Sequence, residues 1–133
     1  MRRLLYGIAL LASAGALLLP AAADASGTVK VSIANFKIKP ATGSTSPGRT
    51  TFVVRNSDSM VHELVVIRTN RKAGDLPVKG ATASEKGKVG AAEDIGAGQT
   101  KRVTVNLAKG HYALICNLPG HYQGGMFADF TVR

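Results

Sequence analysis

The single cysteine of this chain lies in a short segment that also holds two other metal-binding side chains. Cys116 is separated from His121 by four residues, and His121 is separated from Met126 by four more. A thiolate, an imidazole and a thioether therefore occur within eleven residues. This mixture suits copper, because Cu(I) prefers sulfur ligands whereas Cu(II) prefers imidazole nitrogen.

A second imidazole is available outside this segment. His62 begins the run HELVVIRT, which is rich in β-branched residues and typical of a strand. Two histidines and one cysteine, with a weak axial methionine, form the ligand set of blue-copper electron-transfer sites. We therefore predict that one copper ion is bound by His62, Cys116, His121 and Met126.

Each of these residues also has an ordinary explanation when it is considered alone. A lone cysteine or methionine is most often a buried apolar residue, and a histidine at the start of a strand needs no ligand role. The combination favours a metal site. Residues 26–133 contain one cysteine, two methionines and three histidines, and the segment from Cys116 to Met126 holds one of each.

The third histidine provides a check on this assignment. His111 precedes Cys116 by five positions, and an odd separation places two strand side chains on opposite faces. We expect His111 to point away from the copper as a surface or packing residue. Tyr112 and Leu114 should share the inner face with Cys116.

The predicted sulfur ligand has one competitor. Met60 is two positions before His62, so the two side chains would lie on the same face of a strand. Met126 is the better candidate because it follows His121 on the same loop. This loop also contains residues that permit tight turns, so that three side chains can reach one ion. They are Pro119, Gly120, Gly124 and Gly125.

Downstream of residue 25 the sequence consists of short strand-like runs separated by turn signals. In the first run, Val29, Val31 and Ile33 alternate with Lys30 and Ser32, which gives one apolar and one polar face. The pattern predicts an all-β sandwich or barrel of about 7–8 strands. Strands are expected at Thr28–Ile38, Thr51–Arg55, His62–Thr69, Thr100–Leu107, His111–Cys116 and Met126–Val132, with a turn region at Pro40–Gly48.

The stretch Asn70–Gly98 is the least regular part of the chain. It is rich in Gly, Ala, Lys and Asp, and only Val89–Ile95 has the pattern of a strand. A short helix near Ala73 or Ala81 is compatible with the composition but has no specific signal. Long irregular stretches are either functional loops or tolerated surface insertions, and we expect the second here.

The first 25 residues are predicted to be a secretory signal peptide. The start is basic, Leu4–Leu19 is a nearly unbroken apolar run, and Ala23–Ala25 has the A-x-A pattern of a cleavage site. An uncleaved membrane anchor is the alternative, but the run is short for a span of about 20 residues. The folded domain is then expected to occupy residues 26–133.

The predicted mature chain is basic. Cleavage removes Arg2, Arg3 and Asp24 from totals of 17 Lys+Arg and 8 Asp+Glu, which leaves 15 and 7 and a net charge of +8. Such a charge favours acidic protein partners or anionic membrane surfaces. Nucleic acid is not expected as a partner, because the basic residues are scattered along the sequence, tryptophan is absent and an export signal is present.

Export makes the lone cysteine informative. Cysteines in an oxidising compartment normally pair, and Cys116 has no partner within the chain. It must be an intermolecular link, a free thiol or a metal ligand. Only metal ligation gives it a protected role.

The Cys116–His121–Met126 spacing, with His62 upstream, resembles the cupredoxin family of type 1 blue-copper proteins. The loop length is similar to that of rusticyanins and auracyanins rather than plastocyanins. The resemblance is specific at HELVVI (62–67) and CNLPGHYQGGM (116–126). It implies a Greek-key β-sandwich and one Cu(I)/Cu(II) ion that transfers electrons without bond chemistry. It also implies three equatorial ligands, His62, Cys116 and His121, and the axial ligand Met126.

One residue departs from the family's pattern. Many members have Asn directly after the upstream histidine, where it helps to tie the ligand loops together, whereas this chain has Glu63. Because an unpaired carboxylate beside a buried thiolate is costly, we expect Glu63 to point outward. Backbone N–H groups could still reach the sulfur of Cys116.

These observations lead to the hypothesis of a monomeric, periplasmic or otherwise exported protein that carries single electrons between redox partners. The resemblance implies that a partner such as a cytochrome or an oxidase docks near His121. The docking patch would be apolar and consist of Leu118, Pro119, Gly120 and Gly124.

Three alternatives remain at this point. A periplasmic copper-handling protein, for tolerance, buffering or delivery, would use the same site. A copper enzyme would need further histidines, and only His111 remains after His62 and His121 are assigned. A purely structural β-domain would leave the unpaired Cys116 unexplained.

Overall fold

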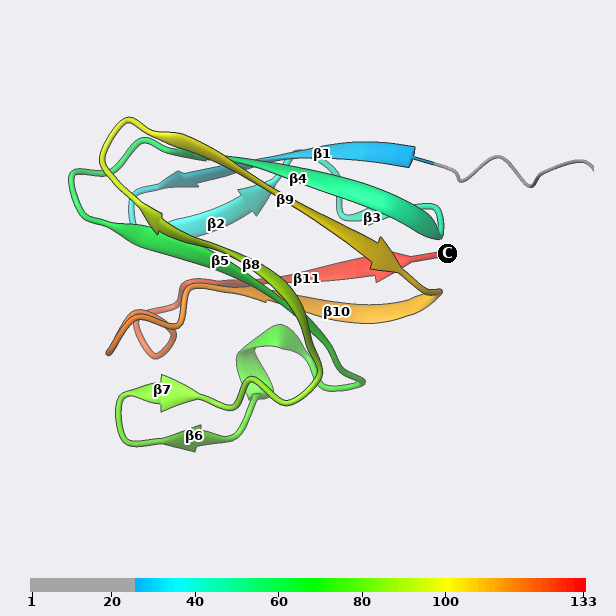
Figure 1. Cartoon of the computed structure of the whole chain (residues 1–133). Coiled ribbons are helices and arrows are strands. Elements are labelled where there is room, and N and C mark those ends of the chain that lie inside the picture. Colours follow the sequence, from blue (N-terminus) through cyan, green and yellow to red (C-terminus); the bar gives the residue numbers. More distant parts are fainter. Residues whose placement is uncertain (1–25) are drawn as a thin grey trace, which may run out of the picture.

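Two β-sheets face each other in the part of the chain that the structure, a computed structural model, describes, residues 26–133 (Figure 1). One sheet has the order β2–β1–β4–β9, and the other has the order β3–β11–β10–β5–β8. The first consists of β2 (Lys37–Pro40), β1 (Ser26–Ala34), β4 (Gly48–Asn56) and β9 (Thr100–Leu107). The second consists of β3 (Ser44–Thr45), β11 (Phe127–Val132), β10 (Gly110–Ile115), β5 (His62–Arg68) and β8 (Lys88–Ile95).

Eight of the strands in residues 26–133 have four or more residues, and three have only two. The pairs β1–β4 and β11–β3 are parallel, whereas the other pairs are antiparallel. The prediction of an all-β Greek-key sandwich of about 7–8 strands is therefore confirmed. Within residues 26–133, no helix is long and apolar enough to cross a membrane.

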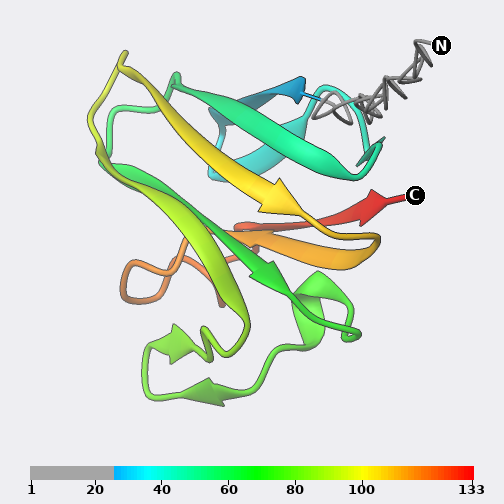
Figure 2. The ribbon, with the colours of Figure 1, turned by 45° about the vertical axis from the view of Figure 1, so that its right-hand side comes forward.

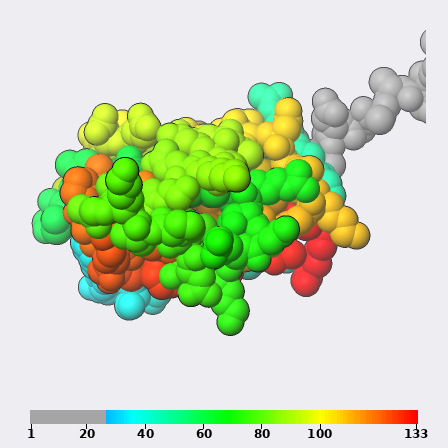
Figure 3. All heavy atoms as spheres, turned by 90° about the horizontal axis from the view of Figure 1, so that it is seen from below, coloured from blue at the N-terminus to red at the C-terminus, as the bar shows by residue number. Residues whose placement is uncertain are grey.

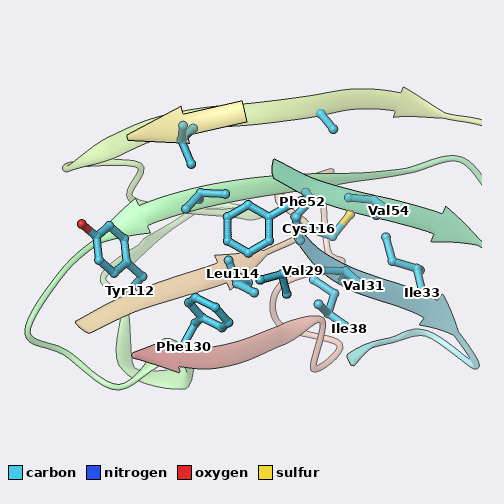
Figure 4. Close-up of a cluster of buried hydrophobic side chains, with 14 of the residues drawn as sticks. Val29, Val31, Ile33, Ile38, Phe52, Val54, Tyr112, Leu114, Cys116 and Phe130 are labelled. Carbon is cyan, nitrogen blue, oxygen red and sulfur yellow. The ribbon is translucent and has the colours of Figure 1, made fainter. Parts of the chain in front are cut away.

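The main core fills the space between the two sheets (Figure 4). Val29, Val31 and Ile33 are all buried on β1, as their alternation predicts. Phe52 of β4 meets Phe130 of β11 edge to face, with ring centroids 5.4 Å apart. The inner residues of β10 in the same cluster are Tyr112 and Leu114, followed by Cys116.

The first expected strand is in fact two strands separated by a tight turn. Asn35 and Phe36 have positive φ angles of 52° and 56°, so the chain reverses between β1 and β2. The carboxylate of Asp58 accepts hydrogen bonds from both backbone N–H groups of the turn, at 2.7 and 2.9 Å. The prediction of one continuous strand over Thr28–Ile38 is wrong because this long-range contact stabilises a left-handed backbone conformation, which Asn adopts more readily than most residues but Phe rarely adopts.

The stretch Asn70–Gly98 is not a mere surface insertion, and that expectation is wrong. It contains the 3₁₀ turn η1 (Ala73–Asp75) and the hairpin of β6 (Val78–Lys79) and β7 (Thr82–Ala83), which lie below the second sheet (Figure 2). Its green atoms cover that face in the space-filling view (Figure 3). The result is a second apolar cluster that buries the outward side of β5 and β10. Its buried members are Val65, Ile67, Ala73, Leu76, Ala83, Ala113, Ile115 and Tyr122.

Both strands that reach the site are therefore buried on two faces. In β5 every residue from Leu64 to Ile67 is buried, and in β10 every residue from Tyr112 to Ile115 is buried. Continuous apolar runs of this kind arise when a sheet is covered on both sides. Residues 70–87, which hold η1, β6 and β7 and are called here the β6–β7 segment, thus pack on the two strands from outside, while the main core packs on them from inside.

We expect that Phe52→Ala lowers the free energy of unfolding by about 3–5 kcal/mol, because it removes a fully buried ring and leaves a cavity. Urea unfolding of the copper-free protein, followed by circular dichroism, measures this change without a contribution from metal binding. The control Val78→Ala trims a side chain that is 47% exposed and should change stability little. A loss below 1 kcal/mol for Phe52→Ala would contradict the assigned core.

Candidate metal centre

The antiparallel pairing of β5 and β10 brings two distant residues together. His62 is the first residue of β5, and Cys116 directly follows the last residue of β10. The register Val65↔Ile115 places the start of one strand beside the end of the other. Both His62 and Cys116 are 0% exposed, so their metal-binding atoms face the interior.

His121 completes a compact group of three donor atoms. The two histidine Nδ1 atoms are 3.2 Å apart, and the sulfur of Cys116 lies 3.4 Å from Nδ1 of His121 and 3.9 Å from Nδ1 of His62. A point equidistant from the three atoms lies about 2 Å from each, which is close to metal–nitrogen and metal–sulfur bond lengths in proteins. Within residues 26–133, these three side chains form a group that could hold a metal ion, because their ligand atoms all lie within 4.8 Å of one another.

The loop from Cys116 to Met126 turns back on itself through backbone hydrogen bonds. The N–H of Cys116 donates to the carbonyl of Met126 at 3.1 Å, and the N–H of Met126 donates to the carbonyl of His121 at 3.2 Å. Gly125 has a φ of 102°, which side chains rarely permit. Met126 is 0% exposed and belongs to the same buried cluster as Cys116.

Phe36 covers one side of the site from the turn between β1 and β2. Its ring centroid lies 4.8 Å from that of His121 and 5.8 Å from that of His62. A Cβ atom at Gly124 would approach the Phe36 ring to 2.4 Å, so the loop needs glycine there. Burial lowers the pKa of His121, with a further contribution from His62, and both effects favour the neutral ring that binds a metal.

Asp58 orients the buried histidine and was not identified from the sequence. Its Oδ2 lies 3.2 Å from Nε2 of His62, which leaves Nδ1 to face the other donors. A carboxylate that accepts the second ring N–H of a histidine fixes its tautomer and ring orientation. Hydrogen bonds from Phe36 and Asn35 hold the pKa of Asp58 below its usual value, although burial opposes them. The sequence offered one clue to this role: Asp58 is an acidic residue only four positions before the candidate ligand His62.

Burial and the backbone act in opposite directions on the thiol of Cys116. Burial raises the pKa of the Cys116 thiol above its usual value, and the backbone N–H groups of Leu118 and Glu63 only partly oppose that rise. That these donors form hydrogen bonds with the sulfur stays a prediction. These donors favour the deprotonated sulfur that a metal requires.

Glu63 lies on the outward side of β5 with Val65 and Ile67, opposite to His62, as expected, but it is half-buried rather than free in solvent. Its Oε1 accepts a hydrogen bond from the N–H of Asn117 at 3.1 Å, so it ties the start of β5 to the residue after Cys116. Burial raises the pKa of Glu63, and the bond from Asn117 opposes that rise. The carboxylate is therefore paired with the backbone N–H of Asn117, a contact between distant residues that the sequence does not reveal.

The β6–β7 segment is hydrogen-bonded to the ligand loop. Asn117 exchanges two hydrogen bonds with Ala83, at 2.8 and 3.0 Å, and donates a third to Glu85 at 3.0 Å. The hydroxyl of Tyr122 accepts from the N–H of Leu76 at 2.9 Å and donates to the carbonyl of Ala73 at 2.7 Å. The stretch that looked irregular in the sequence therefore positions the loop.

His111 and Met60 lie away from the donor group, as expected. His111 has Nδ1 2.8 Å from the carbonyl of Thr69 and Nε2 2.8 Å from Asp129. Met60 is 51% exposed. The structure thus brings His62, Cys116 and His121 together and places Met126 in the adjoining core.

We expect that Tyr122→Phe lowers the free energy of unfolding by roughly 1–3 kcal/mol, because the Leu76 N–H and the Ala73 carbonyl lose a buried partner. Amide hydrogen exchange at Leu76 should become faster. In the control Tyr112→Phe, the lost hydroxyl bonds the carbonyl of Ala108 at the other end of β10. Equal acceleration at Leu76 in both variants would show that the effect is not local to the loop.

We also expect that Glu63→Ala lowers stability by about 1 kcal/mol, because the Asn117 N–H loses its acceptor. Glu63→Gln keeps an acceptor oxygen and should recover most of that loss. Urea unfolding of the copper-free variants measures both values. Identical losses for the two substitutions would mean that the hydrogen bond does not contribute.

The geometry agrees with comparisons to solved structures, which share the fold at low sequence identity. Reduced auracyanin from Roseiflexus castenholzii superposes with a TM-score of 0.61 at 18% identity, over 84% of this chain and 99% of that chain. Auracyanin B gives 0.61 at 22% identity, over 85% and 92%. Rusticyanin from Thiobacillus ferrooxidans gives 0.63 at 14% identity, over 80% and 76%.

Sequence comparison identifies the family. No curated protein sequence matches the chain significantly. The family model described as copper binding proteins, plastocyanin/azurin family, matches residues 25–133. That range holds all three members of the donor group, so the cofactor is copper. The chain is a member of the plastocyanin/azurin family of copper binding proteins, the cupredoxins.

Proposed function

We propose that this protein is a type 1 copper protein that carries single electrons between redox partners outside the cytoplasm. His62, Cys116 and His121 would be the equatorial ligands, and Met126 would be the axial ligand. The observation that carries the proposal is the buried triangle of two Nδ1 atoms and one sulfur. Copper held by this ligand set supplies reversible one-electron chemistry.

The surrounding residues keep the donor atoms in place. Asp58 orients His62, and Phe36 covers His121. These contacts do not depend on a ligand side chain changing position. A site whose shape is fixed by the fold needs little rearrangement when its charge changes by one electron.

His121 is the point at which a partner would approach. It is partly exposed, whereas His62 and Cys116 are buried. Leu118 is partly exposed and Pro119 is exposed beside it on the same loop. A small apolar surface round a partly exposed ligand suits transient docking of a redox protein such as a cytochrome or an oxidase.

Two features support an electron carrier over the other functions. The burial of His62 and Cys116 favours retention of copper over ready release to an acceptor. Within residues 26–133 the remaining histidine, His111, has both ring nitrogens 2.8 Å from oxygen acceptors. We therefore propose that the protein is not an enzyme and builds no second copper centre.

Location and domain limits complete the proposal. The predicted signal peptide, residues 1–25, lies outside the described residues. The family match starts at residue 25, which fits cleavage near Ala25. We propose a monomeric domain at residues 26–133 that acts in the periplasm or another exported location.

We expect that adding Cu(II) to the purified protein produces an intense visible copper–thiolate absorption band, and that Cys116→Ser abolishes it. Met126→Leu is the control: it removes the axial sulfur and should keep a strong band with a changed reduction potential. The wild-type band should disappear and return over repeated reduction and oxidation with copper retained. Loss of copper in the first cycle would favour copper handling, and a Cys116→Ser variant that still turns blue would refute the site.

A further inference from the structure

The outer face of the sheet β2–β1–β4–β9 carries a dense set of positive charges. Because the inward positions of these strands fill the core, the alternate positions point outward. Six outward residues are Lys or Arg, and all six are exposed. This basic sheet face consists of Lys30, Lys37, Lys39, Arg49, Arg55 and Arg102.

Register gathers charges that are scattered in the sequence. Lys30 lies beside Val53, and Val53 lies beside Arg102 on the next strand. In the next row Ser32 lies between Lys39 and Arg55. The interpretation that the basic residues are not clustered is therefore wrong for the folded protein, because pairing of four strands collects them on one face.

No acidic residue lies on these four strands. The acidic residues of the described chain lie on the other sheet or in connections: Asp58, Glu63, Asp75, Glu85, Glu93, Asp94 and Asp129. None of the six cations forms an ion pair with another residue of 26–133. Their charge is thus available to an external partner.

A hollow on this face combines positive charge with an apolar floor. Lys30, Lys39 and Arg55 line it together with Pro40 and Val53. Cations around an apolar floor suit an amphiphile, whose phosphate can meet the cations while its carbon atoms contact the floor. A purely ionic partner would leave this floor without a matching group.

The same face lacks the anchors of a protein interface. Such interfaces are enriched in buried aromatic residues and methionine at their centre. The exposed large apolar residues of the described chain all lie on other elements: Met60, Val61, Val78, Val89 and Phe127. A broad array of cations among hydroxyl and amide side chains fits the phosphate layer of a bilayer better.

We propose that the basic sheet face binds bilayers that contain anionic phospholipids. The ligand loop lies at one end of the sandwich, to the side of this face (Figure 1). A protein seated on the bilayer by this face keeps His121 free to meet partners that diffuse in or on the same membrane. Binding depends on the sheet and not on copper, so it can be tested separately from the proposed electron transfer.

The test compares two variants with equal net charge, each purified after export with its N-terminus verified by mass spectrometry. The face variant carries Lys30→Gln, Lys39→Gln, Arg55→Gln and Arg102→Gln. The control variant carries Lys72→Gln, Lys79→Gln, Lys86→Gln and Lys109→Gln, which are exposed and lie outside the basic sheet face. Circular dichroism and the visible copper band verify that each variant is folded.

Co-sedimentation with vesicles measures binding. Wild-type protein should bind phosphatidylcholine vesicles containing phosphatidylglycerol, in copper-free and copper-loaded form alike, and should not bind pure phosphatidylcholine. Each basic residue near an anionic surface strengthens binding roughly fivefold, so the face variant, which loses four, should bind roughly 600-fold more weakly at low ionic strength. The control variant should lose far less, and inorganic phosphate should compete no better than sodium chloride of equal ionic strength.

Three results would overturn the proposal. Equal losses in both variants would show that net charge alone attracts the protein. Competition by phosphate beyond its ionic strength would show that the hollow binds a free anion. Absence of vesicle binding, combined with weaker association of the face variant with an acidic redox protein, would make the face a protein-docking surface.

Discussion

The pairing of β5 with β10 is the constraint on which the site depends. It joins the start of one strand to the end of another that lies far along the chain, and it thereby places His62 beside Cys116. His121 then needs only the short loop that follows Cys116 to reach the same point. A shift of this register by one residue would turn every side chain of β5 to the opposite face and separate the donors. Apolar burial on both sides of the two strands makes such a shift costly.

Much of the fold follows from residue patterns. The alternation of Val29, Val31 and Ile33 predicted the inner face of β1, and Thr100–Leu107 was predicted with the limits that β9 has. The parity argument placed His111 outside the donor group. These predictions succeeded because each depends on neighbours within a single strand. The ligand set was proposed from donor chemistry and spacing, and the structure brings three of its members within bonding distance of one point.

Features that depend on contacts between distant segments could not be predicted in the same way. The carboxylate of Asp58 stabilises the turn at Asn35 and Phe36, and the N–H of Asn117 pairs with the half-buried carboxylate of Glu63. Neither contact has a sequence signature. The charges on β1, β2, β4 and β9 are likewise separated in the sequence and meet only through strand register. The donor atoms were thus foreseeable from their own residue types, whereas their supports were not.

The second apolar cluster has a consequence for the evolution of the chain. The β6–β7 segment and the outward residues Val65, Ile67, Ala113 and Ile115 cover one another. A descendant that deleted the segment would expose four apolar side chains at once, and one that made these positions polar would detach the segment. Related sequences should therefore gain or lose the two features as a unit. Joint inheritance of the segment and these apolar positions would distinguish relatives whose ligand loop contacts such a segment from relatives whose loop contacts only the two sheets.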